Sequence, residues 1–492
     1  MSEKLRSPWL RCVPVGLLVA GIVCYAAFLW RYVSPYAGGS DSSGYLNSAR
    51  LLAQGRFFAE PRVLPGFSAR EFGEFSHVPL GFVLRGDDQM APTYPIGYPL
   101  QLLVAAGFGW SRAVTVLNVC TVIGSGWILF AYCRKLGISK GLAVGGVGLL
   151  WACPLFIFSA IQPMSDLSAL GWSLVILYSA LKAREGRSWG ILCGAALGFA
   201  VLVRPTNLLL GVPLLVALGF HYRSWLAVAI GGLPSAVFFG YYNARLYGSP
   251  WTTGYRDVSG LFRWEYLWPN LLHFSHWIPV LLSPLIVLGL AAPFVAGARQ
   301  RGAVVLAAWA ATLISFYAFY FHSGETWWYL RFILPAFPAL IVAVLFVLEA
   351  IWRVSRPRSM PAVTVGLALL LMGAIGWQAR QLSRLDVLHL EINERSYPQA
   401  ARWAKNNLPA ESAIFCMQVS GAFFYYTDFL LFRWEQVAPE KYNGLLETIA
   451  RQNRPVYAAL YAFETAEAFG QIGGHWTKLA TVGQVTFWQR EP

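Results

Sequence analysis

The stretch RAVTVLNVCTVIGSGWILFAYC, residues 112–133, decides the class of this protein. A helix needs about 20 apolar residues to cross the hydrocarbon core of a bilayer, and the only charge in this stretch is at its first position. Arg134 and Lys135 follow it directly. An apolar run of this length with basic residues at its end is typical of a transmembrane helix.

The same pattern repeats along the chain and is reflected in its composition. The 492 residues are 57% hydrophobic and 13% charged, whereas soluble chains are about 25% charged. We therefore predict a polytopic α-helical membrane protein. About eleven transmembrane spans are expected, at residues 13–31, 112–133, 141–161, 167–183, 189–203, 207–220, 225–244, 277–297, 302–321, 332–352 and 361–379.

The basic residues indicate an orientation. Arg134 and Lys135 lie between the second and third spans, and Lys182 and Arg184 lie between the fourth and fifth. Every second loop is basic, so these loops are expected in the cytoplasm together with the N-terminus. The net charge of +14 is spread over such loops, so we expect no nucleic-acid partner. A multi-pass protein of a bacterial inner membrane, with its C-terminus outside, is the expected localisation.

The chain divides into two predicted domains. Residues 1–382 form the transmembrane domain, with long outer loops at 32–111 and 245–276. The apolar stretch 95–110 is too short to span and is expected to lie in the interface. From residue 383 to 492 charges return, and strand-like runs alternate with helical patterns, which favours a small α/β domain on the extracytoplasmic side.

Two aspartates occupy comparable positions at the predicted outer membrane edge. Asp41 begins an expected amphipathic helix after the first span, and Asp166 opens the fourth span. One interpretation is that each carboxylate caps its helix, because Asp is favoured at helix starts. The other is that the two acids converge in a functional site, because an ionisable group at this depth is a functional candidate.

Basic and aromatic residues provide further candidates. Arg204 ends one apolar run, and its guanidinium is suited to hold a phosphate, although an arginine at a helix end can also reach outward to water. His322, Glu325 and Arg331 cluster in a short predicted outer loop. These ionisable groups are candidates for substrate binding.

In this order, these stretches resemble the GT-C class of membrane glycosyltransferases. The pattern is similar to the bacterial dolichyl-phosphate-mannose-protein mannosyltransferase-like proteins and to the aminoarabinose transferase that modifies lipid A. The resemblance is carried by the run Asp41–Gly55, by YPIGYPLQLLVA at 94–105, by Asp166, by Arg204 and by RFILPAFP at 331–338.

The resemblance covers about residues 10–350 and implies an activity. The class transfers a sugar from a polyprenyl-phosphate carrier to a lipid, glycan or protein acceptor outside the membrane. Asp41 would then be the base, or would orient the acceptor. Asp166 would position Asp41, the acceptor or a divalent metal. No cofactor is identified beyond that metal, for which these two acids are the only candidate ligands.

The same resemblance implies residues for the phosphate. Arg204, together with Arg331 or Arg85, would hold it. The stretch GDDQMAPTYP at 86–95 departs from the aminoarabinose enzyme, which has a Glu-Lys pair here, so Arg85 is the candidate replacement. Membrane lipids are the expected surroundings of the prenyl chain.

Tyr45 and Tyr94 would line the sugar site, with His322 and Glu325 as further substrate contacts. Two other functions stay open at this point. A non-catalytic membrane scaffold would use the C-terminal domain for binding. A lipid or sugar transporter would need ionisable groups near the bilayer midplane and broken helices in paired halves.

Overall fold

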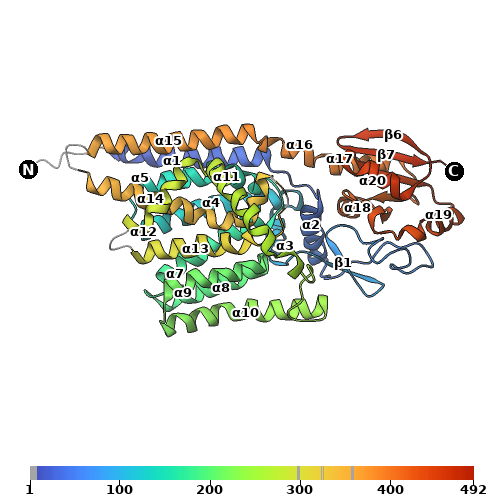
Figure 1. Cartoon of the computed structure of the whole chain (residues 1–492), viewed down its shortest axis with the longest axis horizontal. Coiled ribbons are helices and arrows are strands. Elements are labelled where there is room, and N and C mark those ends of the chain that lie inside the picture. Colours follow the sequence, from blue (N-terminus) through green and yellow to red (C-terminus); the bar gives the residue numbers. More distant parts are fainter. Residues whose placement is uncertain (1–7, 296–299, 323, 325, 356–359, 492) are drawn as a thin grey trace, which may run out of the picture.

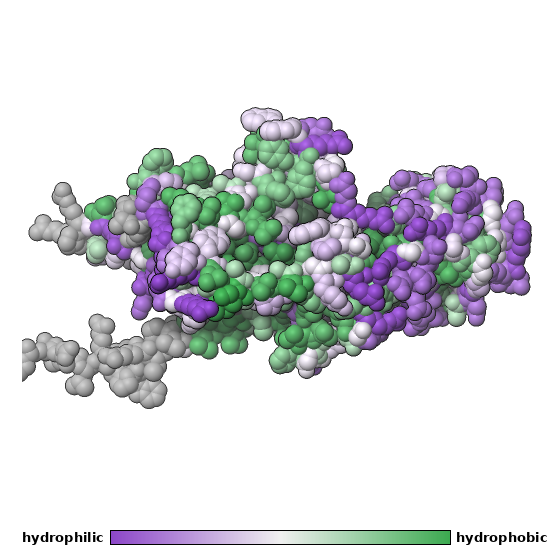
Figure 2. All heavy atoms as spheres, turned by 90° about the horizontal axis from the view of Figure 1, so that it is seen from below, coloured by the Kyte–Doolittle hydropathy of each residue, from purple (hydrophilic) through white to green (hydrophobic). Residues whose placement is uncertain are grey.

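The computed structural model describes residues 8–295, 300–322, 324, 326–355 and 360–491. The molecule is elongated, with a bundle of long helices at one end and a smaller unit with a β-sheet at the other (Figure 1). Apolar residues cover much of the helical bundle, and hydrophilic residues cover the smaller unit (Figure 2). Large apolar side chains such as Trp127 and Phe294 are exposed on the bundle, as expected where lipid is the solvent.

The helices of the bundle follow one another along the chain. They are α1 (Pro8–Tyr32), α4 (Ala113–Lys135), α5 (Lys140–Ala152), α6 (Pro154–Ala160), α7 (Ser165–Lys182), α8 (Arg187–Val203), α9 (Gly211–Leu218), α10 (Tyr222–Tyr247), α11 (Leu267–Leu282), α12 (Ala292–Val295), α13 (Gln300–Ala318), α14 (Phe337–Val354) and α15 (Met360–Arg384). Short 3-10 helices precede α9, α12 and α14, at Pro205–Leu210, Pro284–Ala291 and Trp327–Ala336.

The prediction of a polytopic helical membrane protein is confirmed. Among the described residues, 5 helices are long and apolar enough to cross a membrane, or up to 7 if each of two bent pairs is one span. Shorter apolar helices account for other predicted spans, such as Arg187–Val203 and Pro205–Leu218. The count of eleven and the orientation stay predictions.

Two predicted spans are bent at prolines. The helix of the span 141–161 turns by 62° between Ala152 and Pro154. The span 277–297 differs more, because the chain turns by 108° after Leu282, where Ser283 has a φ of 72°. Pro284 follows, and a proline lacks the N–H that would continue the helix ladder. Since α11 begins at Leu267, the outer loop predicted at 245–276 is also shorter than expected.

The first outer loop is folded. It contains α2 (Ser40–Ala53), the antiparallel hairpin of β1 (Phe82–Arg85) and β2 (Gln89–Pro92), and the apolar α3 (Gly97–Ala105). The predicted helix at Asp41 is present. Residues 42–49 of α2 are all buried, so other parts of the protein cover most of this helix.

The C-terminal unit comprises α17 (Ser396–Asn407), α18 (Ser420–Tyr426), α19 (Tyr442–Arg451) and α20 (Ala462–Ile472) around a sheet, and α16 (Leu390–Glu394) leads into it. The strands are β3 (Ala413–Cys416), β4 (Leu430–Arg433), β5 (Val456–Tyr461), β6 (Trp476–Val482) and β7 (Val485–Arg490). Their order is β4-β3-β5-β7-β6. The first three strands are parallel and the last two antiparallel, so the predicted C-terminal α/β fold is confirmed as a mixed sheet.

The first outer loop shares the hydrophobic core of this unit. Leu64 and Phe72 pack in the same cluster as Phe415 of β3. The backbone N–H of Ala438 donates to the carbonyl of Phe72, at 2.9 Å. Residues of the C-terminal sheet and of the first outer loop therefore fold together, and the predicted boundary between residues 382 and 383 stays a prediction.

Candidate functional site

Asp41 is the second residue of α2 and pairs with an arginine from a distant segment. Its Oδ2 lies 2.8 Å from Nη1 of Arg331, with the two side chains 28% and 17% exposed. The N-cap of α2 is Gly39, and no side chain caps the helix. The capping interpretation is therefore wrong for Asp41, although a carboxylate in the first turn still interacts favourably with the helix dipole.

Asp166 has the same place in α7. Its Oδ1 lies 2.7 Å from Nη1 of Arg204, and the side chains are 3% and 14% exposed. Met164 is the N-cap of α7, again without a side-chain cap. The capping interpretation is also wrong here. Arg204 is in position for this pair because α8 ends at Val203, before Pro205.

Two contacts join these ion pairs into one site. The hydroxyl of Tyr45 donates to Oγ of Ser165 at 2.8 Å, which connects α2 to the start of α7. The ring of Phe332 has both guanidinium carbons, those of Arg204 and Arg331, 5.2 Å from its centroid. We call Asp41, Arg331, Asp166 and Arg204 the ion-pair site.

Tyrosines line one side of the ion-pair site. The hydroxyls of Tyr94 and Ser40 lie 2.7 Å apart, and the Tyr94 ring is 5.0 Å from that of Tyr45 and 6.0 Å from that of Tyr255. Burial, and then the charge of Asp41, raise the pKa of Tyr94 well above its ordinary value. The phenol therefore stays protonated and can donate a hydrogen bond.

Tyr45 has a partner within the protein, and its predicted contact with the sugar stays a prediction. It is buried, its hydroxyl is used by Ser165, and burial followed by the charge of Asp41 raises its pKa. The structure thus places it between the two acid-bearing helices. Tyr255, which the sequence did not single out, makes no hydrogen bond to another described residue and faces Tyr94.

Arg331 has a hydrogen-bond donor that no described residue satisfies. Its Nη1 contacts Asp41 and lies 3.4 Å from the sulfur of Met164. Its Nε is buried and has no partner among the residues that the structure describes. An unpaired buried donor costs free energy, so the described residues do not fully satisfy this guanidinium.

Two other predicted residues have partners outside the ion-pair site. Arg85 ends β1, and its guanidinium stacks on Phe58, 4.8 Å from the ring centroid. His322 hydrogen-bonds through Nδ1 to Oδ1 of Asn270 at 2.9 Å. Glu325 lies outside the described residues.

Metal ligands are sparse. Within residues 8–295, 300–322, 324, 326–355 and 360–491, no group of three or more His, Cys, Asp or Glu side chains could hold a metal ion. Asp41 and Asp166 are each already paired with an arginine. Hard cations usually take six or more oxygen ligands, so these two carboxylates alone would not complete the coordination of a divalent metal.

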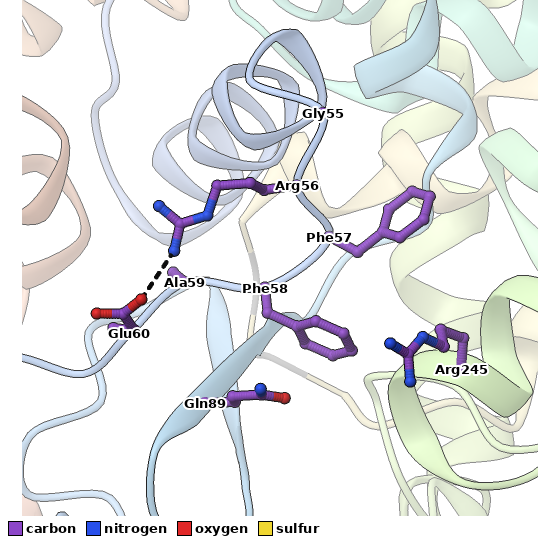
Figure 3. Close-up of a pocket in the computed structure, with 8 residues that line it drawn as sticks. All are labelled: Gly55, Arg56, Phe57, Phe58, Ala59, Glu60, Gln89 and Arg245. Carbon is purple, nitrogen blue, oxygen red and sulfur yellow. Dashed lines mark hydrogen bonds and ion pairs between the residues drawn. The ribbon is translucent and has the colours of Figure 1, made fainter.

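A separate pocket of about 320 Å³ opens beside the end of α2 (Figure 3). It is lined by residues 55–60, Gln89 and Arg245, and Arg56 pairs with Glu60 at 3.2 Å. No residue of the ion-pair site lines it.

Sequence reasoning missed three residues that hold the site together. Ser165 had a usable signal, since Ser165–Asp166 repeats the dipeptide Ser40–Asp41 at a second helix start. Phe332 and Tyr255 had none, because their roles depend on contacts between distant segments.

Comparison with known proteins supports the fold. The sequence profile of the family described as dolichyl-phosphate-mannose-protein mannosyltransferase matches residues 98–240. No curated protein matches the chain in sequence. The resemblance to this family and to the aminoarabinose transferase is confirmed by this match and by the solved structures.

Three solved structures share the fold. ArnT from Cupriavidus metallidurans bound to undecaprenyl phosphate is 13% identical with a TM-score of 0.61, covering 96% of this chain and 98% of that one. The archaeal oligosaccharyltransferase AglB from Archaeoglobus fulgidus, in complex with an inhibitory peptide and a dolichol-phosphate, is 11% identical with a TM-score of 0.54, covering 95% and 74%. The arabinofuranosyltransferase AftD from mycobacteria is 13% identical with a TM-score of 0.51, covering 96% and 40%.

Proposed function

We propose that this protein transfers a sugar from a polyprenyl-phosphate carrier to an acceptor at the ion-pair site. The proposal builds on the GT-C fold and on the match of residues 98–240 to the mannosyltransferase family. The acceptor is a lipid, a glycan or a protein, and the reaction takes place on the extracytoplasmic side of a bacterial inner membrane. The single observation that carries the proposal is the convergence of two Asp–Arg pairs on one aromatic ring.

The proposed reaction has a simple balance. The acceptor oxygen forms a bond to the anomeric carbon as the bond from that carbon to the phosphate oxygen breaks. The proton of the acceptor passes to a carboxylate, and the polyprenyl phosphate leaves as an anion. The site therefore needs a base and a cation close together.

Asp41 is the better candidate for the base. Its side chain is 28% exposed, whereas that of Asp166 is 3% exposed, so only Asp41 is open to an acceptor. Asp166 is proposed to hold Arg204 in place. Tyr94, with a protonated phenol near Asp41, is proposed to contact the sugar.

Arg331 is the better candidate for the phosphate. Its side chain is 17% exposed, and its guanidinium can hold a phosphate while keeping its contact to Asp41. Arg204 adds a second positive charge, with its guanidinium carbon 5.2 Å from the Phe332 ring centroid. Arg85 is not needed for this role.

The relatives support the donor class. The ArnT structure holds undecaprenyl phosphate and the AglB structure holds a dolichol-phosphate. For this chain we propose a carrier of the same class, with its prenyl chain along the lipid-facing helices. Residues 1–382 would form the transmembrane domain of about eleven spans, with the N-terminus in the cytoplasm and residues 383–492 outside.

The experiment is an assay of sugar transfer from a polyprenyl-phosphate donor by the purified protein. Asp41→Asn keeps the size of the side chain and removes the base, so transfer is expected to fall by a factor of about 100–10,000. Asp88→Asn, which changes an exposed acid in the turn between β1 and β2, is the matched control and should keep wild-type turnover. Wild-type turnover of Asp41→Asn would refute the proposal, and a scaffold would tolerate both changes.

A further inference from the structure

The carboxyl edge of the parallel strands in the C-terminal unit has an unusual occupant. In open α/β sheets, ligands bind in the crevice outside the carboxyl ends of the strands, where the strand order reverses. Here β3 lies between β4 and β5, so this crevice lies between the segments that follow β3 and β5. The residues that fill this crevice lie next to one another in the fold.

Polar side chains are gathered at this edge. Nε2 of Gln418, just after β3, donates to the hydroxyl of Tyr397 at 2.9 Å. The ring of Tyr397 lies 5.6 Å from that of Tyr461, the last residue of β5. Glu394 is nearby, with Oε2 buried and no partner among the described residues.

The segment Gly38–Gly39, which leads into α2, is seated against these side chains. A Cβ at position 38 would overlap the carboxylate of Glu394. A Cβ at position 39 would come within 3.1 Å of Nε2 of Gln418 and 3.5 Å of the Tyr397 hydroxyl. A side chain at position 38 would have to displace the Glu394 carboxylate, and the protein's own chain occupies the place of a ligand.

Helix α18, which begins at the same edge, holds the neighbouring backbone. The hydroxyl of Tyr426 accepts from the N–H of Ala37 at 2.9 Å, and the carbonyl of Gly421 accepts from Nδ2 of Asn47 at 3.1 Å. A Cβ on Gly421 would overlap the backbone carbonyl of Leu80 and the Ser43 hydroxyl. These contacts lie on both sides of Ser40, where α2 begins.

We infer that the C-terminal unit is a positioning module, which holds Gly38–Gly39 at the ligand edge of its sheet and so fixes the start of α2 and the carboxylate of Asp41. Its catalytic consequence rests on the proposed function. Asp41 is only two residues beyond Gly39, so a shift of this segment moves the carboxylate relative to Arg331. A displacement of about 1 Å at a reacting group can cost a factor of about 100 in rate.

Two variants test the inference. Gly421→Ala forces α18 away from the Leu80 backbone, and Tyr426→Phe removes one hydrogen bond to the segment with little change in shape. Gly444→Ala is the matched control, because this glycine of α19 has open space around its Cα. Hydrogen–deuterium exchange over residues 36–46 and the steady-state constants for a polyprenyl-phosphate sugar are measured on the full chain.

The expected result is graded. Gly421→Ala should raise exchange over residues 36–46 and lower kcat by about 10 to 100-fold, with KM for the donor within about twofold of wild type. Tyr426→Phe should do the same to a smaller degree, and Gly444→Ala should do neither. Tyr426→Phe also covers the case in which Gly421→Ala does not fold.

Other results overturn the inference. Unchanged exchange in Tyr426→Phe and in a folded Gly421→Ala would show that α18 does not hold the segment. Raised exchange with wild-type kcat would show that the segment does not position Asp41. If the wild-type protein transfers no sugar, the proposed function fails, while the exchange data still decide whether the C-terminal unit holds residues 36–46.

Discussion

Helices α2 and α7 begin with the same dipeptide, but the aspartates in their first turns lie in different surroundings. Ser40–Asp41 and Ser165–Asp166 each place a carboxylate in the first turn, and each carboxylate pairs with an arginine. The start of α7 is enclosed by the helical bundle, so Asp166 is 3% exposed. The start of α2 lies between the bundle and the C-terminal unit, and Asp41 is 28% exposed (Figure 1).

This difference teaches that the surroundings, and not the local sequence, assign the two acids their roles. A buried ion pair is expensive to break, because the partner left behind is an uncompensated charge. A partly exposed pair can exchange its partner for a ligand. We therefore propose a structural role for Asp166 and a chemical role for Asp41.

The largest expected effect is a difference in stability between variants of the two aspartates. Asp166→Asn leaves the Arg204 guanidinium without its partner, and we expect the free energy of unfolding to fall by about 3–5 kcal/mol. Asp41→Asn should cost about 1 kcal/mol or less, because that pair is partly in contact with solvent. Thermal unfolding of both variants in detergent measures the difference. Equal decreases in the free energy of unfolding would contradict the different roles of Asp41 and Asp166.

The second effect is a pH dependence of stability that arises from an acid beside the segment leading into α2. Burial raises the pKa of Glu394, which faces Gly38, from 4.5 to about 7. Between these values the folded protein holds a proton that the unfolded chain has released, so stability falls as pH rises from about 4.5 to 7. The full difference is roughly 3 kcal/mol.

Glu394→Gln should remove this dependence, while Glu440→Gln, at an exposed position of the same unit, should keep it. Unfolding midpoints between pH 5 and 8 would show it. A wild-type profile that rises over this range, or one that Glu394→Gln leaves unchanged, would contradict the burial of this acid against the α2 segment.

A third effect tests the arginine of the exposed pair. Arg331→Gln removes a charged donor, and hydrogen bonds to charged groups contribute about 1.5–3 kcal/mol. We expect the Kd for polyprenyl phosphate to rise by roughly 10 to 100-fold. Arg256→Gln, which changes an exposed pair with Glu74, is the control. An unchanged Kd in Arg331→Gln would remove Arg331 from the phosphate site.

The smallest effect concerns the connection between the two helix starts. Tyr45→Phe removes the hydrogen bond to Ser165 and should lower the free energy of unfolding by about 1 kcal/mol. Tyr241→Phe, at an exposed position of α10, should have no effect. If both variants have the same free energy of unfolding, the hydroxyl of Tyr45 does not couple the two helices.

Much of the fold could be predicted because it depends on local patterns. The apolar runs place the helices of the bundle, and alternating runs place β3, β5, β6 and β7. The bends at Pro154 and Pro284 were not foreseen, since the apolar pattern continues through both prolines. The order of the strands in the C-terminal sheet was not predictable either, because the pairing of short strands depends on the whole sheet.

The candidate site shows the same limit. Both aspartates and both arginines could be singled out as ionisable groups at the ends of apolar runs. Which acid pairs with which base depends on the packing of segments far apart in the chain. The contact between Asn47 and Gly421, 374 residues apart, is a further example that no local pattern contains.

The most direct test of the central claim is a structure of the protein with polyprenyl phosphate bound. We expect phosphate density within hydrogen-bond distance, about 3 Å, of the Arg331 guanidinium and beside the carboxylate of Asp41. Phosphate bound instead at Arg56 and Arg245, in the pocket of Figure 3, would contradict it.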